Sequence, residues 1–494
     1  MLVVSQTNPT NSQTCMAQGG MNAALYEDTT NYHVEDTLIS SKNLASKNAV
    51  EIFCNNILDE IEFLDSIGMA FSRDGEKIAQ RKLGGARNKR ACYAKDYTGL
   101  RVLHVLFDYA NKLQIPFLNN YKLLKFLVDE NKIYGAEFLD IKTSEVKTIK
   151  AKSVILASGG YSGIFGKHST NQLSTIGDGI LASYNAGAVL SNLEFVQFHP
   201  TALKSSSILI SESARGEGGY LLNSDNERFV NELLARDVVV KAIHEQLQKG
   251  KEVFLDVRHI SHILKHVMPQ ELKLAKLHEN IDIASELLPI KPAAHYSMGG
   301  VLVDNFARSS IRGLFAVGEA SQSNIHGANR LGGNSLSELL VFGKIAVQCA
   351  FEYIKSQNFQ DIKFENSSNL DVIFSLNGDK NFYKTKDELS DILYNFAGIV
   401  KNENSLIKAL NFIENIDVHE YKIGDKSTTF NTDLKNFLEF LSQIELSKLY
   451  IKSAFFRKES RGSHLRDDFE SENVEFDGIS IIDKDKIFIH KLID

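Results

Sequence analysis

Tryptophan is absent from this chain of 494 residues, and cysteine is scarce. The four cysteines, Cys15, Cys54, Cys92 and Cys349, lie far apart, with no CxxC pair and no histidine at ligand spacing. This pattern does not suit a zinc or iron–sulfur site, so we expect no metal ligands. We expect the thiols to be reduced and structural. Any redox chemistry therefore has to come from an organic cofactor.

Long apolar runs and basic clusters are also missing. No uninterrupted apolar stretch approaches the ~20 residues of a membrane span, and the first residues (MLVVSQTNPTNSQT) lack the basic and apolar regions of a signal peptide. The net charge is −7, from 55 Lys and Arg against 62 Asp and Glu, without an extended basic block. These features predict a cytoplasmic protein with no direct membrane insertion and no nucleic-acid partner.

The length indicates about three domains. Residues 1–5 predict a short strand, residues 47–68 predict a helix that ends at a glycine, and residues 115–157 consist of short β-branched runs separated by turns. From about residue 358 glycine nearly disappears, and Phe, Leu and Ile recur every three or four residues. This last part is expected to be a separate helical domain.

Two apolar runs end in glycine and point to a ligand. Residues 153–157 lead into Gly159 and Gly160, and residues 313–318 (GLFAVG) lead into Glu319. Wholly apolar runs of this length are typical of buried parallel strands, which feed ligand-binding turns at their carboxyl ends. We therefore predict an α/β fold with a doubly wound sheet.

Five further segments carry chemically active side chains, mostly beside glycine or proline, where a backbone can approach a ligand closely. They are LEFVQFHPT (193–201), SESARGEGGY (211–220), NELLARDVV (231–239), KPAAHYSMGG (291–300) and HGANRLGGNSL (326–336). They supply His199, Glu212, Arg215, Arg236, His295 and Arg330. A guanidinium group matches a carboxylate in bidentate fashion, so several Arg and His in glycine-rich loops favour a small dianionic acid as ligand.

Six of these motifs occur together in one order: HPT, RGEGGY, ARDVV, AHYSMGG, FAVGE and HGANRLGGNSL. From residue 2 to about 470 the chain resembles the flavoprotein subunit of succinate dehydrogenase and fumarate reductase, whose superfamily includes L-aspartate oxidase. The resemblance implies a Rossmann-like FAD-binding domain with an inserted α+β capping domain, then a helical and a short C-terminal domain. The implied bounds are 1–195 with 295–357 for the FAD-binding domain, 196–294 for the capping domain, 358–455 for the helical domain and 456–494 for the C-terminal domain.

The resemblance also implies the reaction, in which succinate and fumarate interconvert by hydride transfer with the flavin while a proton moves at the neighbouring carbon. Arg330 and His295 would bind one carboxylate, and His199 with Ser211 the other. Arg236 would carry the proton, with Glu212 and Arg215 as the relay to solvent. From the residues alone, Glu212 or a histidine would be the acid–base group, because arginine normally stays protonated.

The implied FAD contacts lie in five parts of the chain, at 5–20, 159–160, 178, 319 and 335–336. They are Ser5, Ser12, Gln13, Thr14, Ala17, Gln18, Gly19, Gly20, Gly159, Gly160, Asp178, Glu319, Ser335 and Leu336. Asp178 would bind the nucleotide and Glu319 the ribityl or ribose hydroxyls. Ser335 and Leu336 would lie at the isoalloxazine edge, beside a helix N-terminus.

The chain departs from this family in its first residues. The family begins with a strand and a GxGxxG turn ahead of the point where MLVVS aligns, and neither occurs here. Either the start codon is misplaced or the chain is a truncated form. A non-catalytic remnant that serves in assembly is therefore an alternative to an enzyme subunit.

A second departure concerns the attachment of the flavin. Many members of membrane complexes link FAD to the histidine of an SHT segment, where this chain has Ser12-Gln13-Thr14. Glutamine cannot form that bond. We therefore expect non-covalent FAD and a lower flavin potential, which would suit fumarate reduction.

The third question is the substrate. Aspartate oxidases place a glutamate before the Gly-Gly pair of the capping loop, where this chain has Leu83 before Gly84-Gly85. The segment SRGSHLRDDF also resembles the dehydrogenase pattern. The segment HVEDTLI (33–39), the absence of a flavin-linking histidine and the modest length instead favour L-aspartate oxidase, which remains the alternative.

The same resemblance implies that the chain has partner subunits. The chain carries no cluster ligands of its own, so electrons would pass between FAD and an iron–sulfur subunit and, through it, a membrane anchor and a quinone. The protein could then be peripheral on the inner face of the cell membrane.

Overall fold

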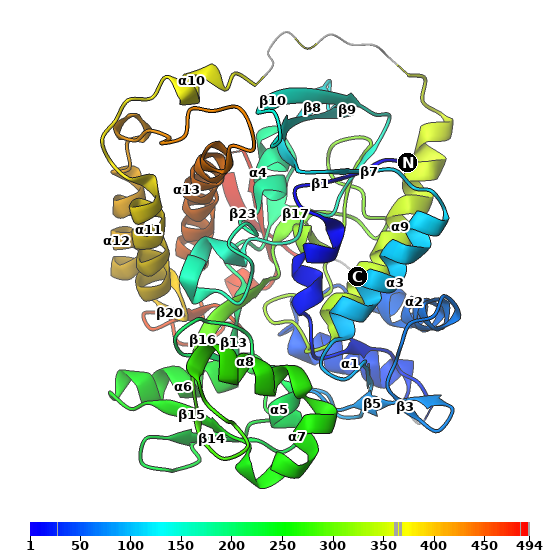
Figure 1. Ribbon diagram of the computed structural model, residues 1–494, viewed down its shortest axis with the longest axis vertical. Coiled ribbons are helices and arrows are strands. Elements are labelled where there is room, and N and C mark those ends of the chain that lie inside the picture. Colours follow the sequence, from blue (N-terminus) through cyan, green and yellow to red (C-terminus); the bar gives the residue numbers. More distant parts are fainter. Residues whose placement is uncertain (27, 360–363, 365–367, 485, 493–494) are drawn as a thin grey trace.

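Short parallel strands flanked by helices form the part of the protein where the FAD contacts are expected (Figure 1). The computed structural model describes residues 1–494 except 27, 360–363, 365–367, 485 and 493–494. Strand β1 (Val3–Ser5) pairs with β7 (Phe117–Asn119), and β11 (Val154–Leu156) pairs with β18 (Leu314–Ala316). Within the described residues no strand joins the two pairs, so the parallel sheet consists of two pieces.

The helices beside these strands follow the sequence pattern. They are α1 (Thr30–Ser40), α2 (Lys47–Ser66), α3 (Thr98–Lys112), α4 (Asp178–Asn185) and α9 (Asn334–Lys355). Helix α2 begins where the Ser46 hydroxyl accepts a hydrogen bond from the Ala49 amide, and its apolar face packs against α1 and α9. It ends two residues before Gly68, which has a φ of +98°. A left-handed residue is the usual helix stop, so the predicted end is correct to within two residues.

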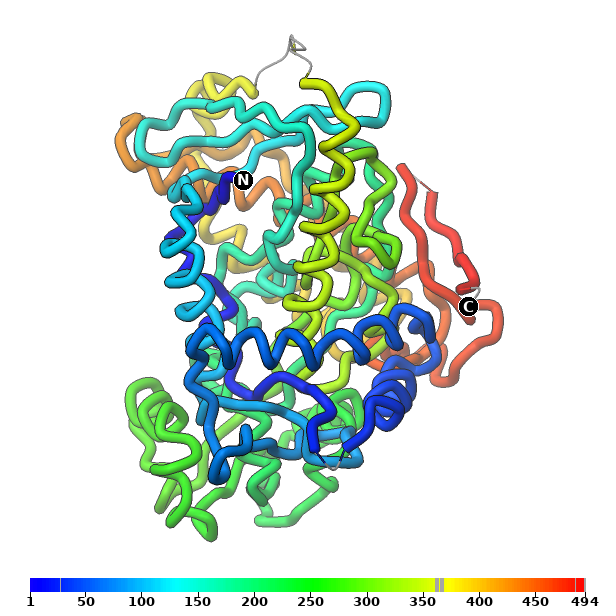
Figure 2. Tube along the Cα trace, turned by 90° about the vertical axis from the view of Figure 1, so that its right-hand side faces the viewer, coloured from blue at the N-terminus to red at the C-terminus, as the bar shows by residue number. Residues whose placement is uncertain are grey.

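The β-rich segment forms an antiparallel meander of β8 (Tyr121–Asp129), β9 (Lys132–Asp140) and β10 (Glu145–Lys150). The two predicted turns fall between these strands. Figure 2 shows the meander at one end of the molecule, beside the long helix α9.

The region 196–294 has its own sheet and its own buried core. The strands run in the order β13 (Val196–Leu203), β16 (Leu288–Ser297), β15 (Val253–Asp256) and β14 (Tyr220–Asn223). Around them lie α5 (Ser213–Gly216), α6 (Arg236–Gln248), α7 (Ser261–Val267) and α8 (Pro269–Glu279). This region, green in Figure 1, projects at the opposite end from the meander. We refer to it as the capping region.

The last part of the chain is mainly helical. It contains α10 (Asp371–Phe374), α11 (Phe382–Ala397), α12 (Glu403–Glu414) and α13 (Thr432–Phe456). Two short strands, β20 (Val400–Lys401) and β21 (Leu465–Arg466), pair in parallel. A terminal hairpin of β22 (Ile479–Asp483) and β23 (Lys486–His490) completes a sheet with β12 (Leu190–Ser191), β17 (Gly300–Leu302) and β19 (Ser321–Gln322). The C-terminal strands therefore extend a sheet of the FAD-binding part.

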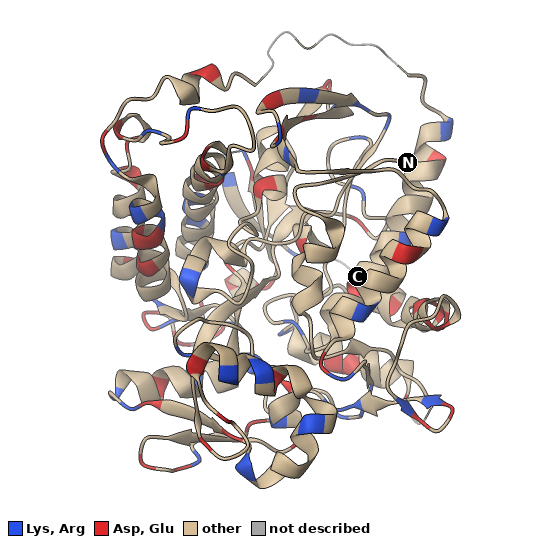
Figure 3. Ribbon diagram, in the orientation of Figure 1, with Lys and Arg blue, Asp and Glu red and all other residues tan. Residues whose placement is uncertain are grey.

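Figure 3 shows that Lys and Arg positions alternate with Asp and Glu positions along the ribbon in all parts of the molecule. None of the described helices combines the length and apolar character that a membrane crossing requires.

A fully buried ion network ties the C-terminal part to the rest. The Arg457 Nε lies 2.6 Å from Glu194 Oε1, and Arg457 Nη1 lies 2.7 Å from Glu459 Oε1. All three side chains are 0% exposed. The Ser480 hydroxyl donates to the other oxygen of Glu194 at 2.8 Å. Removing one member of such a group leaves its partners buried and uncompensated, which is costly.

The variant Glu194→Ala should therefore lose ~3 kcal/mol of unfolding free energy, measured by urea unfolding. The control is Glu388→Ala, since its pair with Lys384 is exposed and 3.8 Å long. That change should cost less than about 1 kcal/mol. Equal losses in the two variants would contradict the structural role of the network.

Candidate active site

Two neighbouring strands of the capping region bring a pair of histidines together. His199 comes from β13 and His295 from β16, and their ring centroids are 5.0 Å apart. His199 Nδ1 lies 3.2 Å from the Thr201 amide nitrogen, and His295 Nδ1 lies 2.7 Å from the Thr170 hydroxyl. Within the described residues neither Nε2 has a hydrogen-bond partner, so both remain available to a ligand.

Arg236 is the first residue of α6 and forms a close ion pair with Glu212. Its Nε and Nη2 donate to Glu212 Oε2 at 2.9 and 2.6 Å, and its Nη1 donates to Gln197 Oε1 at 2.9 Å. The other carboxylate oxygen of Glu212 accepts from the Gly84 amide at 2.7 Å. A Cβ at Gly84 would lie 2.4 Å from that oxygen, so this approach requires glycine.

Arg330 extends from the loop before α9 to Gln197, which Arg236 also contacts. Its guanidinium carbon lies 4.1 Å from the Tyr296 ring centroid, and its Nη2 lies 3.3 Å from Gln197 Oε1. Gln197 is held in turn by Asn329 Oδ1 and the Arg330 carbonyl, at 2.8 and 2.9 Å. Gln197 therefore connects Arg236 to Arg330.

Sequence reasoning missed Gln197. The signal was its place two residues before His199 on one strand, since alternate residues share a face of a sheet. A search of the residues at i ± 2 from each candidate would have found it.

Arg215 lies deeper. Its side chain is 0% exposed, Nη1 donates to the Glu232 carbonyl at 2.6 Å, and Nη2 lies 3.9 Å from Glu212 Oε1. Ser211 is also buried, but its hydroxyl contacts Ser213 at 3.0 Å. The preceding residue, Ile210, is hydrogen-bonded through its backbone to Thr201, which places Ser211 on a segment beside His199.

The electrostatics of this cluster are strongly positive. Three buried guanidinium groups face Glu212, whose pKa burial would raise but the charges of Arg236 and Arg215 hold below its usual value. Burial, then Arg236, lowers the pKa of Arg330 to about 10. Burial, with Arg236 next, also holds the pKa of both His199 and His295 well below the ordinary value. The histidines are therefore neutral at physiological pH, and the arginines repel one another.

Several buried nitrogen atoms of these arginines lack a hydrogen-bond partner among the described residues. They are Arg330 Nε and Arg215 Nε and Nη2. Unsatisfied buried donors are rare in proteins and need an explanation. A dianion beside Arg330 would give its Nε a partner and would offset the positive charge of the cluster.

The predicted FAD residues gather at the carboxyl ends of the parallel strands, where ligands of α/β folds bind. Ser5 ends β1, Gly159 and Gly160 follow β11, and Glu319 follows β18. A Cβ at Gly160 would lie 2.3 Å from Glu319 Oε1, so the chain packs closely there. Glu319 accepts from the amide and hydroxyl of Ser297, and burial raises its pKa to about 7.

The turn with Ala17, Gln18, Gly19 and Gly20 fits a bound cofactor. Gln18 is 1% exposed, yet neither its amide oxygen nor its amide nitrogen has a partner in the described part of the chain. Leu83 touches this turn, because a Cβ at Gly19 would lie 3.6 Å from Leu83 Cδ1. The orphaned amide of Gln18 is the feature expected where a polar ligand completes the site.

Two predicted contacts have protein partners. Asp178 pairs with the buried Lys122, which leaves its Oδ1 without a partner in the described residues. Gln13 Oε1 accepts from the Gln172 amide at 2.8 Å, and Gln13 Nε2 donates to the Thr170 carbonyl at 3.4 Å. Gln13 therefore holds the loop whose Thr170 contacts His295.

The remaining predicted contacts lie on two helical segments. Ser12 and Thr14 flank Gln13 at a 3₁₀ turn that packs against α3, and Ser335 and Leu336 lie in the first turn of α9. Gly333 before α9 has a φ of +89°. The N-terminus of α9 thus follows a tight turn close to the Arg330 loop.

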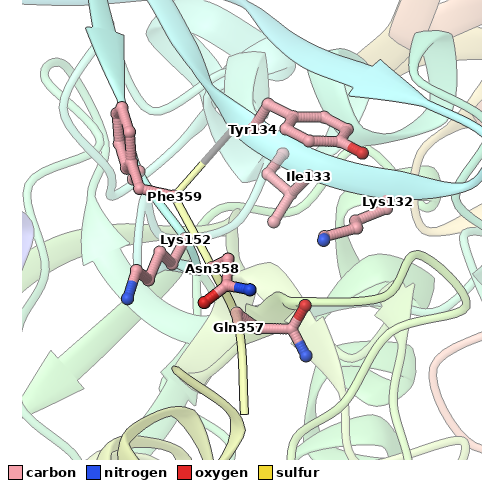
Figure 4. Close-up of a pocket in the computed structure, with 8 residues that line it drawn as sticks. Lys132, Ile133, Tyr134, Lys152, Gln357, Asn358 and Phe359 are labelled. Carbon is pink, nitrogen blue, oxygen red and sulfur yellow. The ribbon is translucent and has the colours of Figure 1, made fainter. Parts of the chain in front are cut away.

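A surface depression elsewhere carries no such chemistry. It is lined by Lys132, Ile133, Tyr134, Lys152 and neighbouring residues (Figure 4). It lies beside β9, at the opposite end of the molecule from the capping region (Figure 1). It is therefore separate from the histidine–arginine cluster.

Comparison with known proteins shows the family to which the chain belongs. An FAD binding domain model matches residues 1–336, and a fumarate reductase flavoprotein C-terminal model matches residues 386–490. The flavoprotein subunit of 8-methylmenaquinol:fumarate reductase from Wolinella succinogenes is 35% identical over 95% of this chain and 81% of its own length. The chain belongs to the succinate dehydrogenase and fumarate reductase flavoprotein family.

Further members of the family are similar over almost the whole chain. An uncharacterised FAD-dependent oxidoreductase of Methanocaldococcus jannaschii is 37% identical over 97% of this chain and 91% of its own length. The FrdA chain of Escherichia coli quinol fumarate reductase superposes with a TM-score of 0.93, at 30% identity, over 99% of this chain and 92% of that chain. These matches confirm the predicted fold and the FAD-dependent oxidoreductase class. The domain bounds and the role of each site residue stay predictions.

The surplus of positive charge leads to a test at Arg330. The variant Arg330→Gln should unfold at the same or a higher temperature without ligand, because one source of repulsion is gone. It should lose most of the rise in melting temperature that succinate or malonate gives the unchanged protein. Thermal unfolding with and without dicarboxylate measures both effects. A ligand-induced rise that persists in the variant would contradict the assignment.

Proposed function

We propose that this chain is the flavoprotein subunit of a succinate dehydrogenase or fumarate reductase and that it interconverts succinate and fumarate. The observation that carries the proposal is the buried cluster of Arg215, Arg236 and Arg330 around the neutral pair His199 and His295. Such a cluster is costly unless a ligand compensates its charge. A four-carbon dicarboxylate brings two negative charges on a short carbon chain.

In this proposal the two ends of the dianion are bound differently. The Arg330 guanidinium and His295 Nε2 bind one carboxylate, and His199 Nε2 with the Ser211 hydroxyl binds the other. The Tyr296 ring supports Arg330 from one side, at 4.1 Å. Charged and neutral donors around one carboxylate stabilise the negative charge that builds up there during reduction of the double bond.

FAD, when bound, supplies the hydride equivalent. The chain's own contribution is the proton. Arg236 is positioned to deliver it because Glu212 Oε2 contacts both Nε and Nη2. Once Arg236 has given up its proton, the Glu212 carboxylate can take up a proton from the solvent side and pass it to Arg236. Arg215, 3.9 Å from the other oxygen of Glu212, extends this path away from the histidines. Arg236 thereby acts as an acid although a free arginine would not.

The variant Arg236→Ala should lower the rate of fumarate reduction by reduced viologen by roughly 10²–10⁴-fold in the FAD-loaded protein. The matched control is Arg258→Ala, since that arginine lies in the same region with a side chain 46% exposed. Near-normal turnover in Arg236→Ala would exclude the proton role. Absence of turnover in the unchanged, FAD-loaded protein would favour the non-catalytic alternative.

Leu83 argues against L-aspartate as the substrate. It is 2% exposed and lies beside the turn at Gly19, and an aspartate oxidase is expected to place a glutamate at this position. An apolar side chain there offers no counter-charge to a substrate ammonium group. The matched relatives, named as fumarate reductase and succinate dehydrogenase subunits, support the same choice.

We further propose that the flavin is not covalently attached. Gln13 stands where a flavin-linking histidine is expected, and both ends of its amide bond the backbone of residues 170–172. Denaturation in acid should therefore release all the flavin into the supernatant, as measured by its absorbance. Yellow flavin that stays with the precipitated chain would contradict this proposal.

Partners are proposed from the relatives. Two of the matched structures are quinol–fumarate reductases, one of them with menaquinol molecules. The described residues hold no group of three or more His, Cys, Asp or Glu that could bind a metal ion. We infer an iron–sulfur subunit as the electron partner and, through it, a membrane anchor with a quinone. The chain would then lie peripherally on the inner face of the cell membrane.

A further inference from the structure

A second group of buried charges lies between the FAD-binding part and the capping region. Asp96 precedes α3 and is 0% exposed, and Arg81 in β5 (Gln80–Arg81) is 5% exposed. Glu271 belongs to α8 of the capping region and is 1% exposed. None of the three belongs to the proposed catalytic cluster, so their burial has no explanation in the reaction itself.

Asp96 caps a helix of the other region. Its Oδ2 accepts from the Gln270 amide at 2.6 Å and the Glu271 amide at 3.3 Å, in the first turn of α8. Helix α8 has no side-chain cap of its own, since Met268 precedes it. The free amides of a first turn need an acceptor, and a carboxylate also interacts favourably with the helix dipole. Asp96 therefore attaches α8 to the FAD-binding part.

Glu271 continues this connection to the substrate segment. Its Oε1 accepts from the Ser211 amide at 3.0 Å. Ser211 is followed directly by Glu212, the partner of Arg236. The hydrogen bonds thus lead from Asp96 through the first turn of α8 and Glu271 to the two residues at the edge of the catalytic cluster.

We propose that Asp96 and Glu271 are positioning residues that latch the capping region onto the FAD-binding part and hold Ser211 and Glu212 in place for the dicarboxylate. This inference deepens the proposed function and rests on it. The latch acts through two backbone contacts, Asp96 with α8 and Glu271 with Ser211. It touches neither substrate nor flavin.

The protonation of Glu271 gives the latch a pH dependence. Burial, and then the nearby Asp96, raises the pKa of Glu271 to about 8. Burial also raises the pKa of Asp96. The other groups that face this pair are Arg81, which lowers both pKa values, and Tyr97. Above about pH 8 two carboxylates are ionised side by side in a buried place, and they repel each other.

The raised pKa of Glu271 also makes the stability of the folded protein depend on pH. Glu271 has a higher pKa in the folded protein than its ordinary value, so the folded state retains a proton that the unfolded chain loses. Stability is then lost as the pH rises from about 4.5 to about 8, and it changes no further above that. Glutamine at this position keeps an oxygen for the Ser211 amide but cannot ionise.

The experiment compares Glu271→Gln, Glu271→Ala, Asp96→Asn and Asp96→Ala in the FAD-loaded protein. We expect the two alanine variants to raise the KM for fumarate roughly 10-fold with kcat within about 3-fold, and the two amide variants to restore KM at pH 7. The KM of the unchanged protein should rise between pH 7 and 9, and in Glu271→Gln this rise should disappear. The same substitution on the same helix, Glu279→Gln, is the control and should behave as the unchanged protein.

A second measurement is independent of activity. The melting temperature of the unchanged protein should fall between pH 5 and 8 relative to that of Glu271→Gln, without any substrate. If the protein does not reduce fumarate, this comparison still tests the latch, so failure of the proposed function and failure of the latch are distinguishable. If the alanine variants do not fold, the pH profiles of KM and of melting temperature in the amide variants test the latch. Identical pH profiles of KM and of melting temperature in Glu271→Gln and the unchanged protein would overturn the latch.

Discussion

The mutual repulsion of buried arginines is the constraint on which the rest of the site depends. Arg215, Arg236 and Arg330 are each less than 10% exposed, and Glu212 is the carboxylate that holds the first two together. Each guanidinium would be more stable in water, so other contacts of the folded protein must offset the free-energy cost of burying all three. These contacts include Gly84, Gln197 and the Tyr296 ring, which support the cluster from three directions. The positive cluster is therefore already assembled in the protein alone, as the proposed binding of a dianion requires.

The same arrangement explains why both histidines are neutral. Burial and the nearby positive charge make protonation of His199 and His295 unfavourable, which is the opposite of what a nearby carboxylate would do. A neutral imidazole with Nδ1 bonded to the protein keeps one defined role for Nε2. Charge and geometry thus come from the arginines, and orientation comes from Thr170 and Thr201.

The cluster is assembled from segments that are far apart in the sequence, and its integrity depends on how the capping region meets the FAD-binding part. Gly84 contacts Glu212 across that boundary, and Asp96 contacts α8 across it. Loops between domains often carry function because a rigid scaffold positions them. Here backbone amides provide much of that positioning, since they are donors whose place is set by the fold and not by a rotamer.

Much of the local structure could be predicted from periodicity and turns. The helix at 47–66, the meander of β8 to β10 and the strands that end before Gly159 and Gly318 all form within a few residues of the places that the sequence pattern indicates. Most of the candidate arginines and histidines could also be found, because glycine or proline near them marks places where a ligand can approach, whereas the role of Arg236 came from the resemblance. Asp96 and Glu271 could not be recognised, since nothing in their neighbours distinguishes them from ordinary polar residues.

The sequence by itself therefore determined which elements form and which side chains are chemically equipped for a small diacid. Only the tertiary structure decided which of them meet: that Glu212 pairs with Arg236, that Gln197 connects two arginines, and that Ser211 is held by Glu271. The physical reason is the distance along the sequence over which each kind of contact acts. Helices, strands and turns depend on residues a few positions apart, whereas these contacts join residues 24 to 133 positions apart and form only once the cores have packed.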